Sequence, residues 1–183
     1  YQQRVLNERF QAEVDEDELK KYYEAHQNRF TADRDLIKGI FLKVPLNAPN
    51  IDGLKKWLSD LDTRNLQQIE RYSVQYASVF NYFMEQWTPL SDVVGDVPDL
   101  LSKGSALTKG GQTVEVTDDA FRYLLCVSEG VAKGEAAPFE YAKSLVANVM
   151  LNTRKTAFIK QFESEIKNKA AEDGRLILYN KPD

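Results

Sequence analysis

The first thirty residues alternate apolar and polar side chains with the period of a helix. Apolar residues recur at every fourth position over residues 6–14, which predicts one helix. A second helix is expected from Asp15 to Phe30, because Asp15 suits an N-cap and Glu18 follows three residues later, as in a capping box. The chain therefore opens with two helices.

The pattern then changes to that of a buried strand. Between Asp33 and Val44 apolar residues occupy both faces, and Pro45 ends the run, as expected of a central strand. A turn containing Pro49 follows, and after it the helical period returns twice. The apolar faces of these two helices are Leu54, Trp57, Leu58 and Leu61, then Leu66, Ile69, Ser73 and Tyr76.

The middle of the chain is irregular and ends in a hairpin. Prolines and glycines interrupt residues 79–111, so we expect mostly loop there, with at most a short helix near Leu90–Val94. Val114–Val116 then alternates apolar and polar side chains, Asp118–Asp119 suits a turn, and Phe121–Val127 forms the returning strand.

A long helix is predicted after Pro138, ending at Gly174, with a short edge strand at Leu176–Tyr179. A single helix cannot bury so wide an apolar stripe, so we expect it to pack on the N-terminal helices, or else on a second subunit. The stripe consists of Phe139, Ala142, Leu145, Val146, Val149, Met150, Thr153, Ala157, Phe158, Phe162 and Ile166.

These elements predict an α+β fold in which an antiparallel sheet with packed helices is inserted into a helical domain. The predicted parts are an N-terminal helical segment at 1–32, the sheet domain at 33–134, and the long helix with its terminal strand at 135–183, packing with 1–32.

Composition excludes several classes of function. Apolar residues make up 43% of the 183 residues, enough for a core, and the net charge of -4 gives no basic surface for nucleic acid. No apolar run approaches the length of about 20 residues that spans a membrane. The single cysteine, Cys126, lies in an apolar run and is expected to be a buried structural thiol.

Catalytic chemistry is sparse in this sequence. The only histidine, His26, lies in the second helix, so neither a catalytic triad nor a metal site is expected, and no motif predicts a cofactor. The aromatic residues between Tyr76 and Trp87 either fill the core under a long loop or line a groove for unfolded peptide. Trp87, beside Thr88 and Pro89, is the best exposed candidate.

Four segments resemble one family, the SurA/PpiC-like parvulin-type peptidyl-prolyl cis-trans isomerases and periplasmic chaperones. VDEDELKKYYEAHQNRF at 14–30 resembles the linker helix before the isomerase domain, and NTRKTAFIKQFESEIKNKA at 152–170 resembles the C-terminal helix. DLIKGIFLKVP at 35–45 and FRYLLCVSEG at 121–130 resemble the first and last strands of the parvulin fold. The resemblance implies a small antiparallel sheet with helices packed on it.

The resemblance also implies a degenerate active site. Aligning the apolar pairs of the two strands places Ile40 and Tyr123 where active relatives carry histidines. The family's glycine-rich segment is replaced by residues 81–98, in which Tyr82, Met84 and Trp87 are the expected peptide-binding residues. No catalytic residue is assigned.

The resulting hypothesis is a periplasmic folding factor of SurA type that binds unfolded or proline-containing polypeptides, with a parvulin-like domain that is not catalytic. An export segment is then expected upstream of Tyr1. One alternative is an active isomerase with a non-standard pocket near Ile40, Met84 and Tyr123. Another is a structural module that forms a homodimer through the long helix.

Overall fold

The computed structural model describes residues 14–174. They belong to two compact units, one of residues 27–141 and the other of the residues up to 26 and from 142 onward. Nearly all of the helix predicted over residues 6–14, and the strand predicted at Leu176–Tyr179, lie outside the described residues.

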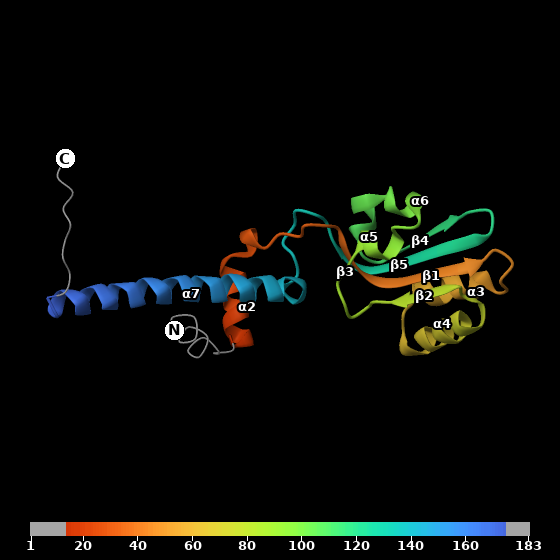
Figure 1. The fold of residues 1–183 in the computed structure, drawn as a ribbon. Coiled ribbons are helices and arrows are strands. Elements are labelled where there is room, and N and C mark those ends of the chain that lie inside the picture. Colours follow the sequence, from red (N-terminus) through yellow and green to blue (C-terminus); the bar gives the residue numbers. More distant parts are fainter. Residues whose placement is uncertain (1–13, 175–183) are drawn as a thin grey trace. The chain divides into compact units, whose positions relative to one another are not determined.

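The larger unit is built on an antiparallel sheet, which confirms the α+β prediction (Figure 1). Its strands run in the order β2-β1-β5-β4, and β3 pairs with β1 on the same side as β2. The strands are β1 (Leu36–Pro45), β2 (Val79–Tyr82), β3 (Thr88–Pro89), β4 (Gln112–Thr117) and β5 (Phe121–Val131).

Strand β1 is the predicted central strand. It pairs with β5 along its whole length and with β2 and β3 on its other side, so both of its edges are covered. The register shifts between Lys38 and Gly39. A Cβ at Gly39 would lie 1.9 Å from the carbonyl oxygen of Cys126, so the close approach of β1 and β5 requires glycine there.

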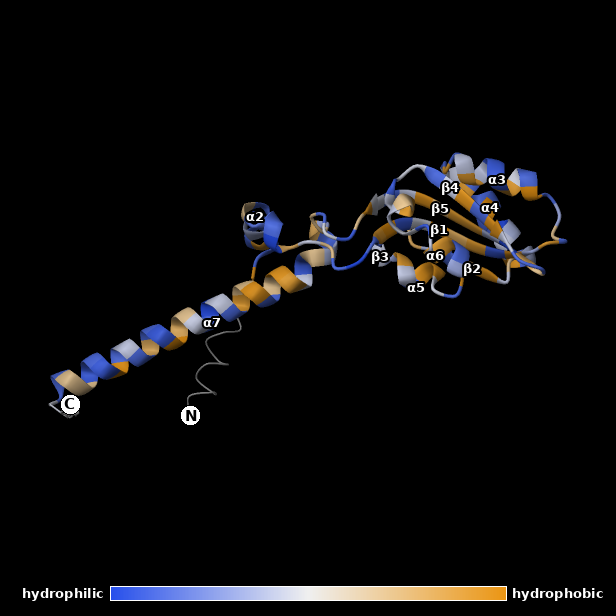
Figure 2. Ribbon diagram, turned by 90° about the horizontal axis from the view of Figure 1, so that it is seen from above, coloured by the Kyte–Doolittle hydropathy of each residue, from blue (hydrophilic) through white to orange (hydrophobic). Residues whose placement is uncertain are grey.

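Two helices cover one face of the sheet, as the sequence predicts. They are α3 (Ile51–Ser59) and α4 (Thr63–Tyr76). Leu54, Leu58 and Ile69 from these helices are buried against Ile40 and Leu42 of β1. Figure 2 shows hydrophobic residues along the strands beneath, whereas α4 carries hydrophilic residues as well.

The other face is covered by short elements, of which only the first was predicted from the sequence. They are α5 (Leu90–Val94), α6 (Pro98–Leu101) and a 3-10 turn at Gly104–Thr108. Apart from the short helix at 90–94, the prediction of loop over residues 79–111 is therefore wrong, and it also missed strands β2 and β3. These elements are two to five residues long, too short to show a period.

The predicted turn between β4 and β5 is confirmed. The Asp118 carboxylate accepts hydrogen bonds from the backbone N–H groups of Ala120 at 2.9 Å and Phe121 at 2.7 Å. It also accepts one from the Tyr123 hydroxyl at 2.6 Å. These bonds hold the pKa of Asp118 below its usual range, the Tyr123 bond most of all, and they fix the hairpin register.

The smaller unit contains α2 (Glu16–Ala25) and nearly all of α7 (Phe139–Glu172). Glu18 accepts a hydrogen bond from Arg154 at 2.7 Å, and Glu16 lies 3.2 Å from the Lys143 amine. Asp15 is the N-cap residue of α2, but its side chain makes no capping hydrogen bond, so the predicted capping box is wrong. A single helical domain of residues 1–32 and 135–183 stays a proposal.

Candidate peptide-binding groove

Strand β2 is an exposed edge made largely of apolar residues. Among the strands of residues 14–174 it pairs with β1 only, and all four of its residues are exposed. The exposed fractions are 43% for Val79, 38% for Phe80 and 46% for Tyr82. Because large apolar side chains gathered at one surface often mark a binding site, this edge is the first candidate.

A groove lies beside this edge, between β2 and α4. Its volume is about 380 Å³, and it belongs to the face of the sheet that carries α3 and α4. Ile40 of β1, Leu66 and Ile69 of α4, and Phe80 and Tyr82 of β2 supply its apolar lining. Thr63, Gln67 and Glu70 supply its polar lining.

The local sequence explains how α4 lines the groove. Thr63, Leu66, Gln67 and Glu70 are three or four residues apart, so they share one side of the helix. Asp62 fixes the start of α4 by accepting a hydrogen bond from the Asn65 backbone N–H at 2.6 Å. The helix ends just before β2, so the two elements that form the groove are joined by residues 77 and 78 alone.

The groove offers contact surface and hydrogen bonds but little acid–base chemistry. Its only charged lining residue is Glu70, which makes no ion pair with any residue in 14–174. The chain's single histidine, His26, belongs to the other unit, where its Nδ1 lies 3.0 Å from the Tyr22 carbonyl oxygen. An apolar lining with few polar groups suits the binding of apolar side chains.

Ile40 and Tyr123, the residues at the expected histidine positions, lie on opposite faces of the sheet. Ile40 is fully buried in the core beneath α3 and α4 and reaches the groove. Tyr123 packs on the core of the other face, where its ring stacks on Phe41 with centroids 6.5 Å apart. The alternative isomerase pocket near Ile40, Met84 and Tyr123 is therefore not assembled.

The three expected peptide-binding residues are also separated. Tyr82 lines the groove, whereas Met84 is partly buried against the core beneath α3 and α4. Trp87 is half-buried and lines a second hollow of about 400 Å³, with the Lys38 amine 4.9 Å from its ring centre. Trp87 is thus not the most exposed aromatic of this stretch, because Tyr82 is exposed to a greater extent.

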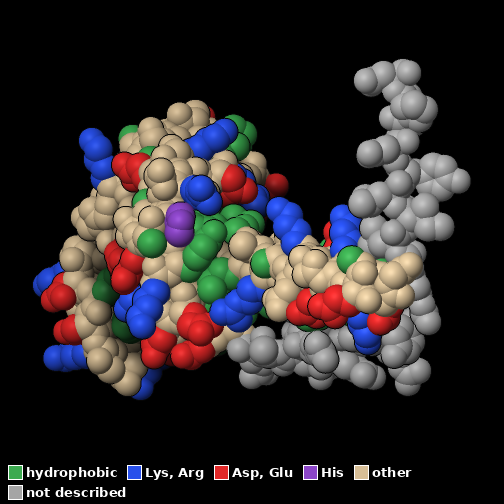
Figure 3. Space-filling view, turned by 90° about the vertical axis from the view of Figure 1, so that its left-hand side faces the viewer, with side chains coloured by type: hydrophobic (Ala, Val, Ile, Leu, Met, Phe, Trp, Pro, Cys, Tyr) green, Lys and Arg blue, Asp and Glu red, His purple; other side chains and the backbone are tan. Residues whose placement is uncertain are grey.

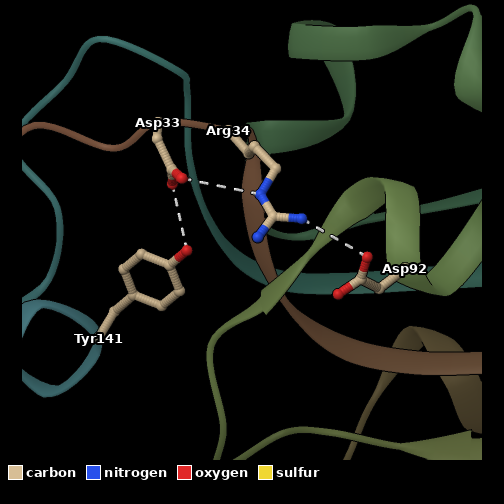
Figure 4. Close-up of polar contacts among 4 residues, drawn as sticks. All are labelled: Asp33, Arg34, Asp92 and Tyr141. Carbon is tan, nitrogen blue, oxygen red and sulfur yellow. Dashed lines mark hydrogen bonds and ion pairs between the residues drawn. The ribbon is translucent and has the colours of Figure 1, made fainter. Parts of the chain in front are cut away.

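Two residues that line the second hollow, Arg34 and Tyr141, make polar contacts with acidic residues nearby (Figure 4). Asp33 accepts a hydrogen bond from the Tyr141 hydroxyl at 3.2 Å and lies 3.9 Å from Nε of Arg34. Arg34 also lies 3.7 Å from Asp92. Burial, followed by the bond to Asp33, raises the pKa of Tyr141. These polar contacts tie β1 to its neighbouring segments and explain the charged residues there as structural.

Cys126 is a buried thiol, as predicted. Its Sγ donates to the Leu58 carbonyl oxygen at 3.4 Å, and burial raises the pKa of the thiol. A thiol that is buried and resists ionisation is a poor nucleophile, so Cys126 has a packing role.

Leu66 and Glu70 were not predicted as groove residues, whereas Phe80 belongs to the aromatic residues expected either to fill the core or to line a groove. Leu66 was correctly predicted to lie on the apolar face of its helix. That prediction does not reveal that β2 leaves part of this face open to the groove. The usable signal was the run of apolar and aromatic residues at 79–82 with no charge, which is unusual for an edge strand.

Other kinds of site find no support in residues 14–174. No group of histidine, cysteine and acidic residues there could hold a metal ion, and no helix within that range has the length and apolarity to cross a membrane. Acidic and basic side chains are interspersed over the face drawn in Figure 3.

Comparison with known proteins identifies no family. No protein family model matches the chain, and no curated protein matches it. The structure is similar to a solved structure of SurA-like chaperones from Campylobacter jejuni, in work on the virulence factor PEB4 and the periplasmic protein Cj1289. The TM-score is 0.34 at 14% identity, and the similarity covers 93% of this chain and 66% of that chain.

Proposed function

We propose that this protein is a folding factor that binds unfolded polypeptides, and that the groove between β2 and α4 holds apolar side chains of the bound segment. One observation carries the proposal: Phe80 and Tyr82 are exposed at a sheet edge directly beside a groove lined by Ile40, Leu66 and Ile69. Burying such apolar surface is the main driving force for capturing unfolded chains.

The family resemblance supplies the finer part of the proposal. The four motif segments suggest a SurA-type factor with a parvulin-like domain, acting in the periplasm after export. The antiparallel sheet with helices on both faces agrees with that suggestion. A non-catalytic domain is proposed because Ile40 and Tyr123 occupy opposite faces and the groove contains no histidine.

The test is binding of an apolar peptide and suppression of aggregation of an unfolded client. The double variant Phe80→Ala, Tyr82→Ala is expected to weaken peptide binding by about tenfold or more, because two aromatic contacts are removed. Val74→Ala is the matched control, since Val74 lies on α4, is 82% exposed and does not line the groove.

The expected result is that the wild type and Val74→Ala bind peptide equally and keep the client soluble. Absence of both peptide binding and client protection in the wild type would overturn the proposed function. Equal peptide binding by the wild type and the double variant would show that the peptide binds outside the groove.

Dimerisation through α7 stays a prediction. Leu145 and Ile166 are exposed apolar residues of that helix, and a dimer interface would cover them. Light scattering over a range of concentrations measures the mass, and a single-chain mass throughout would remove this alternative.

A further inference from the structure

The two edges of the sheet differ in how they are protected. On β4, Glu115 pairs with Arg122 of the neighbouring strand and with Lys55 of α3. Edge charges of this kind discourage another strand from pairing. On β2 the residues are Val79, Phe80, Asn81 and Tyr82, with no charge among them. The β2 edge therefore lacks the usual protection against strand pairing.

The hydrogen-bond pattern shows which backbone groups face outward from β2. The Phe83 N–H donates a hydrogen bond to the Gly39 carbonyl oxygen at 2.9 Å, and the Gly39 N–H donates one to the Phe83 carbonyl oxygen at 3.4 Å. In an antiparallel pair, hydrogen-bonded and non-hydrogen-bonded residue pairs alternate. The next pair, Ile40 with Tyr82, and the pair Leu42 with Phe80 are then non-hydrogen-bonded. The N–H and C=O groups of Phe80 and Tyr82 thus point away from β1, toward the open edge.

The same two residues place their side chains in the lining of the groove. Phe80 and Tyr82 are two positions apart, so they lie on one face of the strand. A segment paired with β2 would satisfy their backbone groups and would present alternate side chains to the groove. One extended chain can make both kinds of contact at once.

We propose that the polypeptide bound by this protein adds to the sheet as a further strand along β2, with its alternate apolar side chains in the groove. This inference rests on the proposed function and specifies how the segment binds. Main-chain hydrogen bonds would supply affinity for any sequence, and the groove would select for apolar residues at every second position.

Charge adds a second preference. Glu70 is the one charged residue of the lining and has no ion-pair partner within residues 14–174. A lysine or arginine near the apolar residues of the bound segment would pair with it. The favoured ligand is therefore an extended segment of alternating apolar and polar residues with one basic residue.

The test uses a short labelled peptide that alternates leucine and threonine and ends in lysine. Two isomers carry N-methyl groups, one on its leucines and the other on its threonines. N-methylation removes the N–H donor but leaves the side chains in place, so only one isomer loses the bonds to β2. That isomer is expected to bind about tenfold more weakly or worse, and the other to bind like the parent peptide.

Each outcome has a definite meaning. Loss confined to the leucine isomer supports antiparallel addition, and loss confined to the threonine isomer supports parallel addition. If the parent binds and both isomers bind equally well or equally poorly, strand addition is wrong while the proposed function stands. If the parent peptide and an unfolded client both fail to bind, the proposed function fails as well.

The preference for a basic residue near Glu70 is tested separately. Replacing the peptide's lysine by glutamate is expected to weaken binding by about two- to fivefold, as for an exposed ion pair. Glu70→Gln should abolish that difference without changing the order of the two methylated isomers. If Glu70→Gln still binds the lysine peptide more tightly than the glutamate peptide by the same factor, Glu70 does not contact the bound segment. If the peptide fails to bind and the wild type self-associates with rising concentration while Phe80→Ala, Tyr82→Ala stays monomeric, the edge is assigned to a second copy of the chain.

Discussion

Strands β1 and β2 are neighbours in one sheet, yet they are buried to opposite extents. Seven positions of β1, including Leu36, Ile40 and Leu42, are shielded by strands on both sides and helices on both faces, whereas all four residues of β2 are exposed. The residue types are nevertheless alike, since both strands are rich in apolar side chains. Their different burial separates apolar residues that stabilise the fold from apolar residues that are available for binding.

The largest expected effect is a loss of stability on truncating β1. Leu42→Ala should lower the free energy of unfolding by about 2–5 kcal/mol, because Leu42 is fully buried in the core beneath α3 and α4. Urea unfolding followed by circular dichroism measures the change. A change below about 0.5 kcal/mol, the range of surface substitutions, would show that β1 is not the packed centre of the sheet.

A smaller loss is expected where β1 approaches β5 most closely. Gly39→Ala introduces a Cβ that would meet the Cys126 carbonyl oxygen at 1.9 Å, so the two strands must shift apart. We expect a destabilisation of about 1–3 kcal/mol in the same unfolding experiment. Unchanged stability would contradict the close pairing of these strands.

The turn beyond β4 gives a pH-dependent effect. Hydrogen bonds, above all the one from Tyr123, lower the pKa of Asp118 in the folded protein. The ionised Asp118 therefore stabilises the folded state at pH values above its pKa in the unfolded chain. This stabilisation is lost as the pH falls through the lower pKa of Asp118 in the folded state. Asp118→Asn should therefore be less stable than the wild type at neutral pH, and the gap should narrow in acid. Urea unfolding measured at several pH values, with Asp119→Asn as the control, tests this prediction. A difference in stability between the wild type and Asp118→Asn that grows as the pH falls would contradict it.

The smallest expected effect on stability is at β2. Phe80→Ala should change the free energy of unfolding by only about 0.5 kcal/mol, because Phe80 lies at an exposed edge. The same variant should bind apolar peptide more weakly than Val74→Ala. A loss of stability as large as that of Leu42→Ala would assign Phe80 to the core instead of the binding surface.

Elements with a clear period were predicted well from the sequence. The continuous apolar run of β1 and the helical stripes of α3 and α4 specify their own structure and burial. The edge strand β2 was missed because four residues are too few to show a period. Which part of the α4 stripe remains open depends on where β2 lies, and this long-range pairing is not encoded locally.

The sequence alone also could not show that Ile40 and Tyr123 lie on opposite faces of the sheet. Tyr123 pairs with Lys43, three residues beyond Ile40 along β1. Because side chains alternate between faces, an odd separation puts the two residues on opposite faces. The register that decides this is set by the pairing of β1 with β5, which no single segment of the sequence reveals.

The most direct test of the account is to map the bound peptide by backbone amide NMR. Addition of the leucine–threonine peptide should shift the amide signals of Phe80 and Tyr82 and those of Leu66 and Gln67 in α4, and should protect the Phe80 and Tyr82 N–H groups from exchange. Shifts confined to the hollow around Trp87 and Tyr141, with Phe80 and Tyr82 unchanged, would contradict it.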